Sequence, residues 1–244
     1  MSDLALAERT CAAILDHAHA QMPRESCGVI INARGHERYV PCRNLAERPE
    51  QHFVIDPLDY IDAEDRADVI AVVHSHPYAP AQPTQPDLVA CERSGVPWII
   101  VSVPNDVFHS FKPSGYRADY VGRQFCYGVL DCFELVRDWY RGELGIEIPE
   151  RPEAASSPSW WKGREARELY IEGYAASGFV AVEEPEPGDM LLFQVGADVA
   201  NHAAIYIGQQ VILHHVWSRL SCREIYGGYW VKNMRVCIRH KTRL

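Results

Sequence analysis

The chain has 244 residues, which is enough for one large domain or two ordinary ones, and we expect two. Hydrophobic residues make up 47% and charged residues 23%, which is typical of a soluble globular protein. The formal charge is -9, from 24 Lys and Arg against 33 Asp and Glu, and no basic block stands out, which argues against nucleic acid as a partner. No apolar run approaches the roughly 20 residues of a transmembrane helix, and the acidic N-terminus lacks the basic start of a secretory signal, so we expect a cytoplasmic chain.

The first half predicts helices packed on a mixed sheet. Helical spacing of apolar residues, alternating strands, and turns marked by Gly, Asn or Pro divide it into successive elements. In order, these are a helix (3–20), a hairpin (28–33 and 36–41), a helix (56–68), a strand (69–73), a proline-rich loop (78–86), a helix (88–95) and two strands (97–103 and 107–112).

The strand at 69–73 runs directly into a His-Ser-His-Pro sequence. Because side chains alternate along a strand, His74 and His76 point to the same face. Asp87 follows the proline-rich loop at the start of a helix, so the loop can return its carboxylate to the two imidazoles. Three protein ligands with an open fourth position are typical of catalytic zinc sites. Such a site also needs a general base, and Glu25, just before the hairpin, is the best upstream candidate.

These residues resemble the JAMM (Mov34/MPN-type) zinc metalloproteases. The shared pattern is His-x-His-Pro, six residues, a hydroxyl residue, two residues and Asp, with a separate Glu before a Cys-Gly strand. The resemblance implies a cytidine-deaminase-like mixed sheet with flanking helices, in which zinc is bound by His74, His76 and Asp87. It also implies that Glu25 is the general base and that Thr84, where the family usually has Ser, helps to bind the oxyanion or to orient the bound water.

The second half opens with a polar, turn-prone segment that we predict to be a linker at 114–122. We therefore expect domains at 1–113 and 123–244. Apolar spacing predicts a helix over 131–142, with Cys132 in its first turn. Free backbone N–H groups and the positive end of the helix dipole favour a thiolate there, so we expect a lowered pKa for this cysteine. Of the eight scattered cysteines, it alone has the setting of a nucleophile.

A cysteine nucleophile needs a base, and the base needs a group that orients it. His202 lies in a predicted strand at 201–208, which a Gln-Gln turn connects to a second strand at 211–215. This hairpin brings His202 and His214 to the same end only if the chain twists or bulges suitably. His215 is the alternative orienting residue.

This second set resembles the NlpC-type peptidases, which are papain-like cysteine enzymes that mostly cut peptidoglycan stem peptides. The shared pattern is Asp-Cys at a helix start, Gly-Asp before a strand, a His on the next strand and a polar residue about twelve positions later. The resemblance implies a Cys-bearing helix packed on an antiparallel sheet, with Cys132, His202 and His214 as the catalytic residues. The usual Ser-Gly after the cysteine is replaced here by Phe133 and Glu134.

The order of a JAMM-type half and then an NlpC-type half resembles the tail tip assembly proteins of lambda-like phages, over nearly the whole sequence. The resemblance implies other tail tip proteins as partners, in the host cytoplasm and with carriage in the virion as an option. It also implies that the zinc half processes a tail assembly protein of ubiquitin-like fold and that the cysteine half opens host peptidoglycan. Two alternatives stay open. One is a catalytically silent structural or chaperone component of the tail tip, and the other is a cellular cell-wall hydrolase, against which the absence of an export signal counts.

Overall fold

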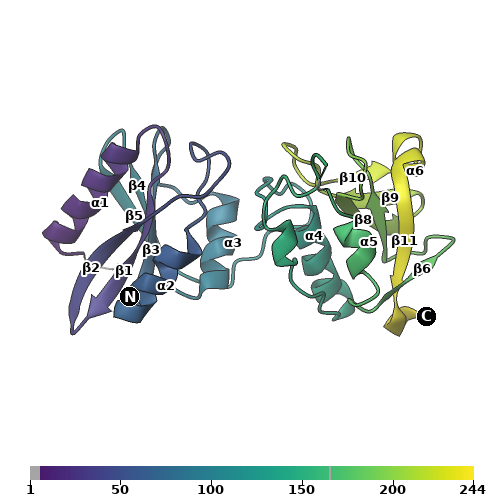
Figure 1. Cartoon of the computed structure of the whole chain (residues 1–244), viewed down its shortest axis with the longest axis horizontal. Helices are drawn as coiled ribbons and strands as arrows, with labels where there is room; N and C mark the ends of the chain where they lie inside the picture. The colour runs from purple at the N-terminus through teal and green to yellow at the C-terminus, as the bar shows by residue number, and fades with distance from the viewer. Residues whose placement is uncertain (1–5, 165) are drawn as a thin grey trace. The chain divides into compact units, whose positions relative to one another are not determined.

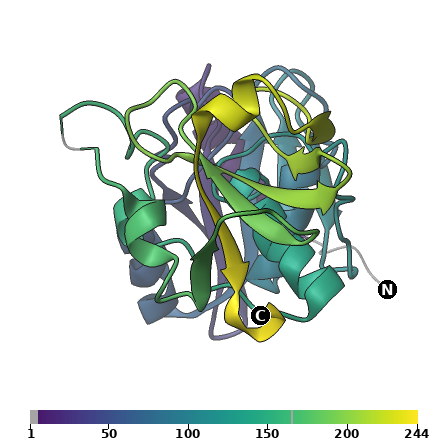
Figure 2. The ribbon, with the colours of Figure 1, turned by 90° about the vertical axis from the view of Figure 1, so that its right-hand side faces the viewer.

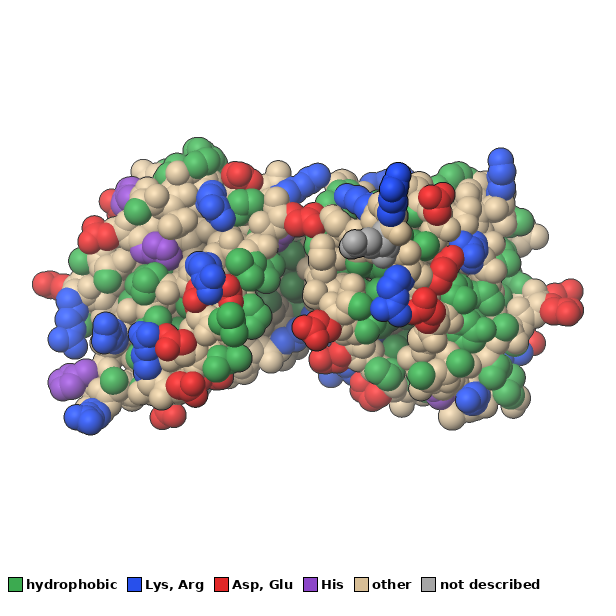
Figure 3. All heavy atoms as spheres, viewed as in Figure 1, with side chains coloured by type: hydrophobic (Ala, Val, Ile, Leu, Met, Phe, Trp, Pro, Cys, Tyr) green, Lys and Arg blue, Asp and Glu red, His purple; other side chains and the backbone are tan. Residues whose placement is uncertain are grey.

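The computed structural model describes residues 6–164 and 166–244, and the chain divides into two compact units between Arg117 and Ala118. Each unit has its own sheet and its own helices (Figure 1). The linker predicted at 114–122 falls across this division. Within the described residues, no helix is both long enough and apolar enough to pass through a bilayer. Acidic and basic side chains are interspersed over the faces of both units that are visible in Figure 3.

The first unit is built on a five-stranded mixed sheet. Its strands lie in the order β2-β1-β3-β4-β5, and β3 and β4 are parallel while the other neighbours are antiparallel. The bounds are β1 (Cys27–Ala33), β2 (His36–Cys42), β3 (Asp68–His76), β4 (Trp98–Ser102) and β5 (Val107–Phe111). The predicted mixed sheet with flanking helices is therefore confirmed.

Helices cover both faces of this sheet, as Figure 1 shows. On one face lies α1 (Glu8–Gln21), which packs its buried side chains against strand residues such as Ile30. On the other face lie α2 (Pro57–Arg66) and α3 (Gln85–Ser94), whose core includes Val72. The helix predicted at 3–20 thus begins at Glu8, and residues 3–5 lie outside the described residues. Because strand side chains alternate, residues 74 and 76 of β3 share the α3 side with Val72.

The second unit is built on a six-stranded antiparallel sheet in the order β10-β9-β8-β7-β11-β6. Its strands are β6 (Phe179–Val182), β7 (Asp189–Phe193), β8 (His202–Gly208), β9 (Val211–His214), β10 (Cys222–Ile225) and β11 (Met234–His240). Its helices are α4 (Cys132–Trp139), which continues as a π-helical turn (Tyr140–Leu144), α5 (Leu169–Gly173) and α6 (Tyr229–Asn233), with 3-10 turns at Glu153–Ala155 and Lys241–Arg243.

Helix α4 packs on one face of this sheet. Its residues Leu135 and Val136 join the core of Ala203 and Leu213, and Figure 2 shows the strands in front of this helix. The opposite face is covered by Trp230 of α6. The predicted arrangement of a cysteine-bearing helix on an antiparallel sheet is confirmed.

Candidate functional site

The first cluster joins the three residues predicted to bind a metal. His74 Nε2 lies 3.2 Å from His76 Nε2 and 3.4 Å from Asp87 Oδ1, and His76 Nε2 lies 3.8 Å from Asp87 Oδ2. The three side chains each offer one ligand atom, and these atoms all lie within 4.8 Å of one another. Two imidazole nitrogens and one carboxylate oxygen that converge in this way fit a zinc ion with one position left for water.

The two imidazoles are held in orientations suited to metal binding. His76 Nδ1 donates to the Pro80 carbonyl over 2.7 Å, which leaves the Nε2 lone pair directed at the cluster. The His74 ring stacks on Phe53 with ring centroids 4.6 Å apart, and the edge of Trp98 contacts it. Burial lowers the pKa of His74 to about 4, so this ring is neutral, as a metal ligand must be.

Thr84 is the N-cap of α3 and forms a capping box with Asp87. The Thr84 backbone N–H and hydroxyl both donate to Asp87 Oδ2 over 2.7 Å, and the Asp87 N–H donates back to the Thr84 hydroxyl over 3.3 Å. The hydroxyl therefore orients a predicted metal ligand. The role predicted for Thr84, which is to help bind the oxyanion or orient the bound water, is not tested by this contact and stays a prediction.

Glu25 lies beside the cluster on the same face of the sheet. The antiparallel pairing of Cys27 with His74 puts the position of Glu25 opposite His76. Its side chain is buried, and burial together with the nearby charge of Asp87 raises the pKa of Glu25 to about 8. A buried carboxyl with a raised pKa next to candidate metal ligands is the setting expected of a general base.

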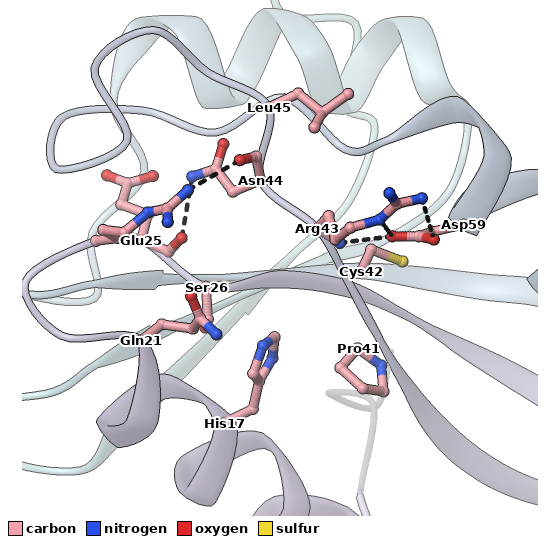
Figure 4. Close-up of a pocket in the computed structure, with 11 residues that line it drawn as sticks. His17, Gln21, Glu25, Ser26, Pro41, Cys42, Arg43, Asn44, Leu45 and Asp59 are labelled. Atoms are coloured by element: carbon pink, nitrogen blue, oxygen red, sulfur yellow. Dashed lines mark hydrogen bonds and ion pairs between the residues drawn. The ribbon is translucent and has the colours of Figure 1, made fainter.

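A hollow of about 560 Å³ also borders Glu25. It lies between the end of α1, the end of β2 and the start of α2 (Figure 4). At one end Arg24 Nη2 donates to the Asn44 carbonyl over 3.2 Å, and at the other Arg43 pairs with Asp59 at 3.0 Å. The hollow thus offers polar groups of both charges next to the candidate base.

The second cluster lies in the other unit, where α4 begins. Asp131 is the N-cap and accepts from the backbone N–H groups of Phe133 and Glu134, which places Cys132 at the first helical position as predicted. The thiol interacts with the Ala203 N–H and the Tyr170 hydroxyl. Burial and the adjacent Asp131 charge raise its pKa to about 11. The lowered pKa that we expect from the helix start is therefore wrong for this conformation, because the thiol is removed from water.

His202 and His214 are brought together by an irregularity in the hairpin. The register of β8 and β9 shifts between Tyr206 and Gly208, which sets His214 opposite Ala204. His202 Nε2 then lies 3.3 Å from His214 Nδ1. Both rings also contact Trp230, on the face of the sheet opposite α4. Among the described residues, His202 and His214 are joined by a hydrogen bond, whereas the structure gives none between the Cys132 thiol and His202.

His215, the alternative orienting residue, lies elsewhere. Its Nε2 donates to the Arg219 carbonyl over 3.0 Å, and its ring contacts Phe125. Burial lowers its pKa to about 4. His214 is thus the residue that contacts His202 directly.

Three polar residues around the second cluster were not predicted. Arg151 Nη2 pairs with Asp131 Oδ2 at 2.5 Å, and the Tyr170 hydroxyl faces the thiol. Glu224 Oε2 lies 3.1 Å from His214 Nε2. Arg151 and Tyr170 come from a segment without periodicity, so the sequence carries no signal for them. For Glu224 the sequence does carry a signal, because it stands two residues after Cys222 and the two side chains share one face of a strand.

Comparison with known proteins supports both halves of this description. Residues 7–113 match the model of the prokaryotic homologs of the JAB domain, and residues 122–239 match that of the NlpC/P60 family. Tail tip assembly protein K of Escherichia phage N15 is 38% identical over 235 residues, which cover 96% of this chain and 95% of that protein. The protein of the same name from Escherichia phage lambda is 34% identical over 190 residues, or 77% of this chain and 90% of that protein. The chain belongs to the tail tip assembly protein K family.

This membership confirms the predicted resemblance to the tail tip assembly proteins of lambda-like phages, with the JAMM-type half first and the NlpC-type half second. A further relative is a probable TtuB-protein conjugate cleaving protease from Thermus thermophilus, 32% identical over 89 residues, which cover 34% of this chain and 60% of that protein. The first cluster lies within the JAB-like domain of this family member, and the second lies within its NlpC/P60 domain.

Proposed function

We propose that this chain is a two-domain hydrolase that acts in phage tail tip assembly. Its JAB-like domain is a zinc peptidase or isopeptidase, and its NlpC/P60 domain is a cysteine peptidase. The observation that carries the proposal is the convergence of His74, His76 and Asp87, with Glu25 on the same face of the sheet. The names of the phage relatives support other tail tip proteins as partners. The chain acts in the host cytoplasm during tail assembly, with carriage in the virion as an option.

In the JAB-like domain, His74, His76 and Asp87 hold the zinc ion. When bound, zinc supplies a Lewis acid that polarises a carbonyl and acidifies a water molecule. Glu25 takes the proton of the attacking water and passes it to the leaving amine, as a general base and then a general acid. Thr84 holds Asp87 in place and, as predicted from the resemblance, helps to bind the oxyanion or to orient the water. The hollow beside Glu25 accommodates the substrate chain.

The substrate of this domain is a tail assembly protein with a ubiquitin-like fold. The Thermus relative, named as a conjugate cleaving protease, supports an isopeptide or peptide bond as the target. Charged groups at both ends of the hollow, Arg24 and the Arg43–Asp59 pair, suit an extended polypeptide rather than an apolar ligand.

In the NlpC/P60 domain, Cys132 attacks the amide carbonyl of a peptidoglycan stem peptide. His202 takes the thiol proton and delivers it to the leaving amine, and water then releases the acyl group from the sulfur. His214 orients His202 through the 3.3 Å contact between their rings. Tyr170 and Arg151 are the neighbours whose hydrogen bond and positive charge favour the thiolate.

Two substitutions separate the activities. The purified chain is incubated with phage tail proteins and, separately, with muropeptides, and the products are identified by mass spectrometry. Glu25→Gln removes cleavage of the tail protein, retains cleavage of muropeptides and keeps the zinc content of the wild type. Cys132→Ala has the opposite effect. If the wild type cuts neither substrate and both variants still support tail assembly, the enzyme proposal is wrong.

A second candidate function is a catalytically silent component of the tail tip. The observation in its favour is the buried thiol of Cys132, whose pKa is raised to about 11. A silent component need not retain zinc. Elemental analysis that finds no zinc, together with full tail assembly by both variants, is the result that favours this function.

A further inference from the structure

A second group of metal-ligand side chains lies at the edge of the sheet in the second unit. It comprises His214 at the end of β9 and Cys222 and Glu224 on the neighbouring strand β10. Cys222 pairs with His214 in the antiparallel register, and Glu224, two residues further on, shares the face of Cys222. His214 Nε2 lies 3.6 Å from Cys222 Sγ and 3.1 Å from Glu224 Oε2. The strand pairing itself therefore gathers one nitrogen, one sulfur and one oxygen ligand.

These separations match a tetrahedral site. With Zn–N and Zn–O bonds of about 2.1 Å, a Zn–S bond of about 2.3 Å and tetrahedral angles, the nitrogen lies about 3.6 Å from the sulfur and about 3.4 Å from the oxygen. The 3.6 Å separation from the sulfur already has this value, and the 3.1 Å separation from the oxygen needs only a small side-chain rotation to reach it. The His214–Glu224 contact is an ordinary hydrogen bond in the absence of an ion, and the pairing of Cys222 with His214 brings the sulfur to the same nitrogen.

We propose that His214, Cys222 and Glu224 form a second binding site for a zinc-class divalent cation, distinct from the site in the JAB-like domain. A thiolate and a carboxylate supply two negative charges, which balance a divalent ion. His214 is buried, whereas the Glu224 side chain is 40% exposed, so an ion and its fourth ligand can reach the site from solvent. Arg219 lies close enough to oppose binding, but it is exposed and can turn into water.

Occupancy of this site determines where the ring protons lie in the second cluster. Without a cation, His214 Nε2–H donates to Glu224, so Nδ1 accepts from His202 Nε2–H and leaves the Nδ1 lone pair of His202 available as a base. A cation on His214 Nε2 puts the proton on Nδ1, which then donates to His202 Nε2 and moves the proton of His202 to Nδ1. The cation thus removes the base. This consequence rests on the proposed cysteine peptidase, whereas the site itself does not.

Cobalt(II) titration of the full-length chain tests the site without any assay of activity. The site in the JAB-like domain has no sulfur ligand, so a thiolate-to-cobalt absorption band in the near ultraviolet reports the second site alone. We expect this band at saturation and a total of about two cobalt ions per chain. Cys222→Ser removes the band and one bound ion, whereas Cys11→Ser, which changes a half-buried thiol in the other unit, retains both. Glu224→Gln weakens cobalt binding by at least the roughly 10-fold typical of losing an outer-shell partner.

Two results overturn the site: a wild type without the band at saturating cobalt, and a band that survives Cys222→Ser. Circular dichroism checks that each variant is folded. Cys222→Ser and Glu224→Gln both change β10, which is an edge strand, so we expect both variants to fold. The regulatory consequence has its own measurement, the ratio of muropeptide cleavage with and without added zinc, which is lower in the wild type than in Cys222→Ser. A chain that shows the cobalt band but never cuts muropeptides retains the site and overturns only the proposed peptidase.

Discussion

Substitution of Thr84 removes two tasks of its hydroxyl at once, capping α3 and holding Asp87. In Thr84→Val, the hydroxyl no longer caps α3 and no longer donates to Asp87 Oδ2. Loss of an N-cap destabilises a protein by about 1 kcal/mol. Loss of a group that hydrogen-bonds to a metal ligand lowers metal affinity by about 10- to 100-fold, which corresponds to about 1.4 to 2.7 kcal/mol. We therefore expect lower thermal stability and a weaker zinc site in the same variant.

Two controls make this experiment specific. Thr84→Ser keeps the hydroxyl and should keep both properties. Asp56→Ala removes the N-cap of α2, whose side chain accepts from the Leu58 N–H, so it should lower stability while zinc affinity stays at the wild-type value. Stability is measured by thermal unfolding of the metal-free protein, and affinity by competition with a chromogenic chelator. A Thr84→Val variant that is destabilised like Asp56→Ala but binds zinc as the wild type does would refute the orienting role.

Further predictions concern metal removal, acid stability and the thiol. Chelation of zinc should lower the unfolding temperature of the wild type, since free zinc at 100 times its dissociation constant adds about 2.7 kcal/mol per site, and His76→Asn, which loses the site in the JAB-like domain, should show a smaller response. Burial opposes ionisation of Asp189, but hydrogen bonds from Arg239 outweigh it and lower the pKa of Asp189. The ionised Asp189 therefore stabilises the fold near neutral pH, and this contribution is lost as pH falls through the folded-state pKa. Asp189→Asn should be less stable at neutral pH and should have a flatter stability profile in acid. Tyr170→Phe removes the hydroxyl that lowers the pKa of Cys132, so alkylation by iodoacetamide at mildly alkaline pH should slow by roughly tenfold per pKa unit. Equal alkylation rates would contradict the last expectation.

The sequence predicted most where a local rule was sufficient. Alternation along β3 puts His74 and His76 on one face, and the proline-rich loop leads directly to Asp87 in the first turn of α3. The sequence could not predict that Phe53 and Trp98 contact the His74 ring, because the three residues come from separate segments of the chain. The hollow that borders Glu25 is missed for the same reason, because its lining comes from α1, β2 and α2.

The second cluster shows where local rules fail. The contact of His202 with His214 depends on a register shift between β8 and β9, which the sequence left as a condition and not a prediction. The pKa of Cys132 was predicted in the wrong direction, because the helix-dipole argument considers only α4. Burial dominates instead, and the hydrogen bonds from Ala203 and Tyr170, which come from distant parts of the chain, offset it only in part.

Both clusters use the first turn of a helix, and a carboxylate in each turn explains why their electrostatics differ. In α3 the carboxylate is Asp87 itself, so the cap bonds from Thr84 and the positive helix end stabilise the charge that a metal ligand must carry. In α4 the carboxylate is the cap Asp131, one residue before Cys132, and its charge raises the pKa of the thiol. The ion pair of Arg151 with Asp131 offsets that charge. The helix start of α3 therefore stabilises the Asp87 charge directly, whereas at the start of α4 the Asp131 charge adds to burial in raising the pKa of Cys132 and the Arg151 charge lowers it.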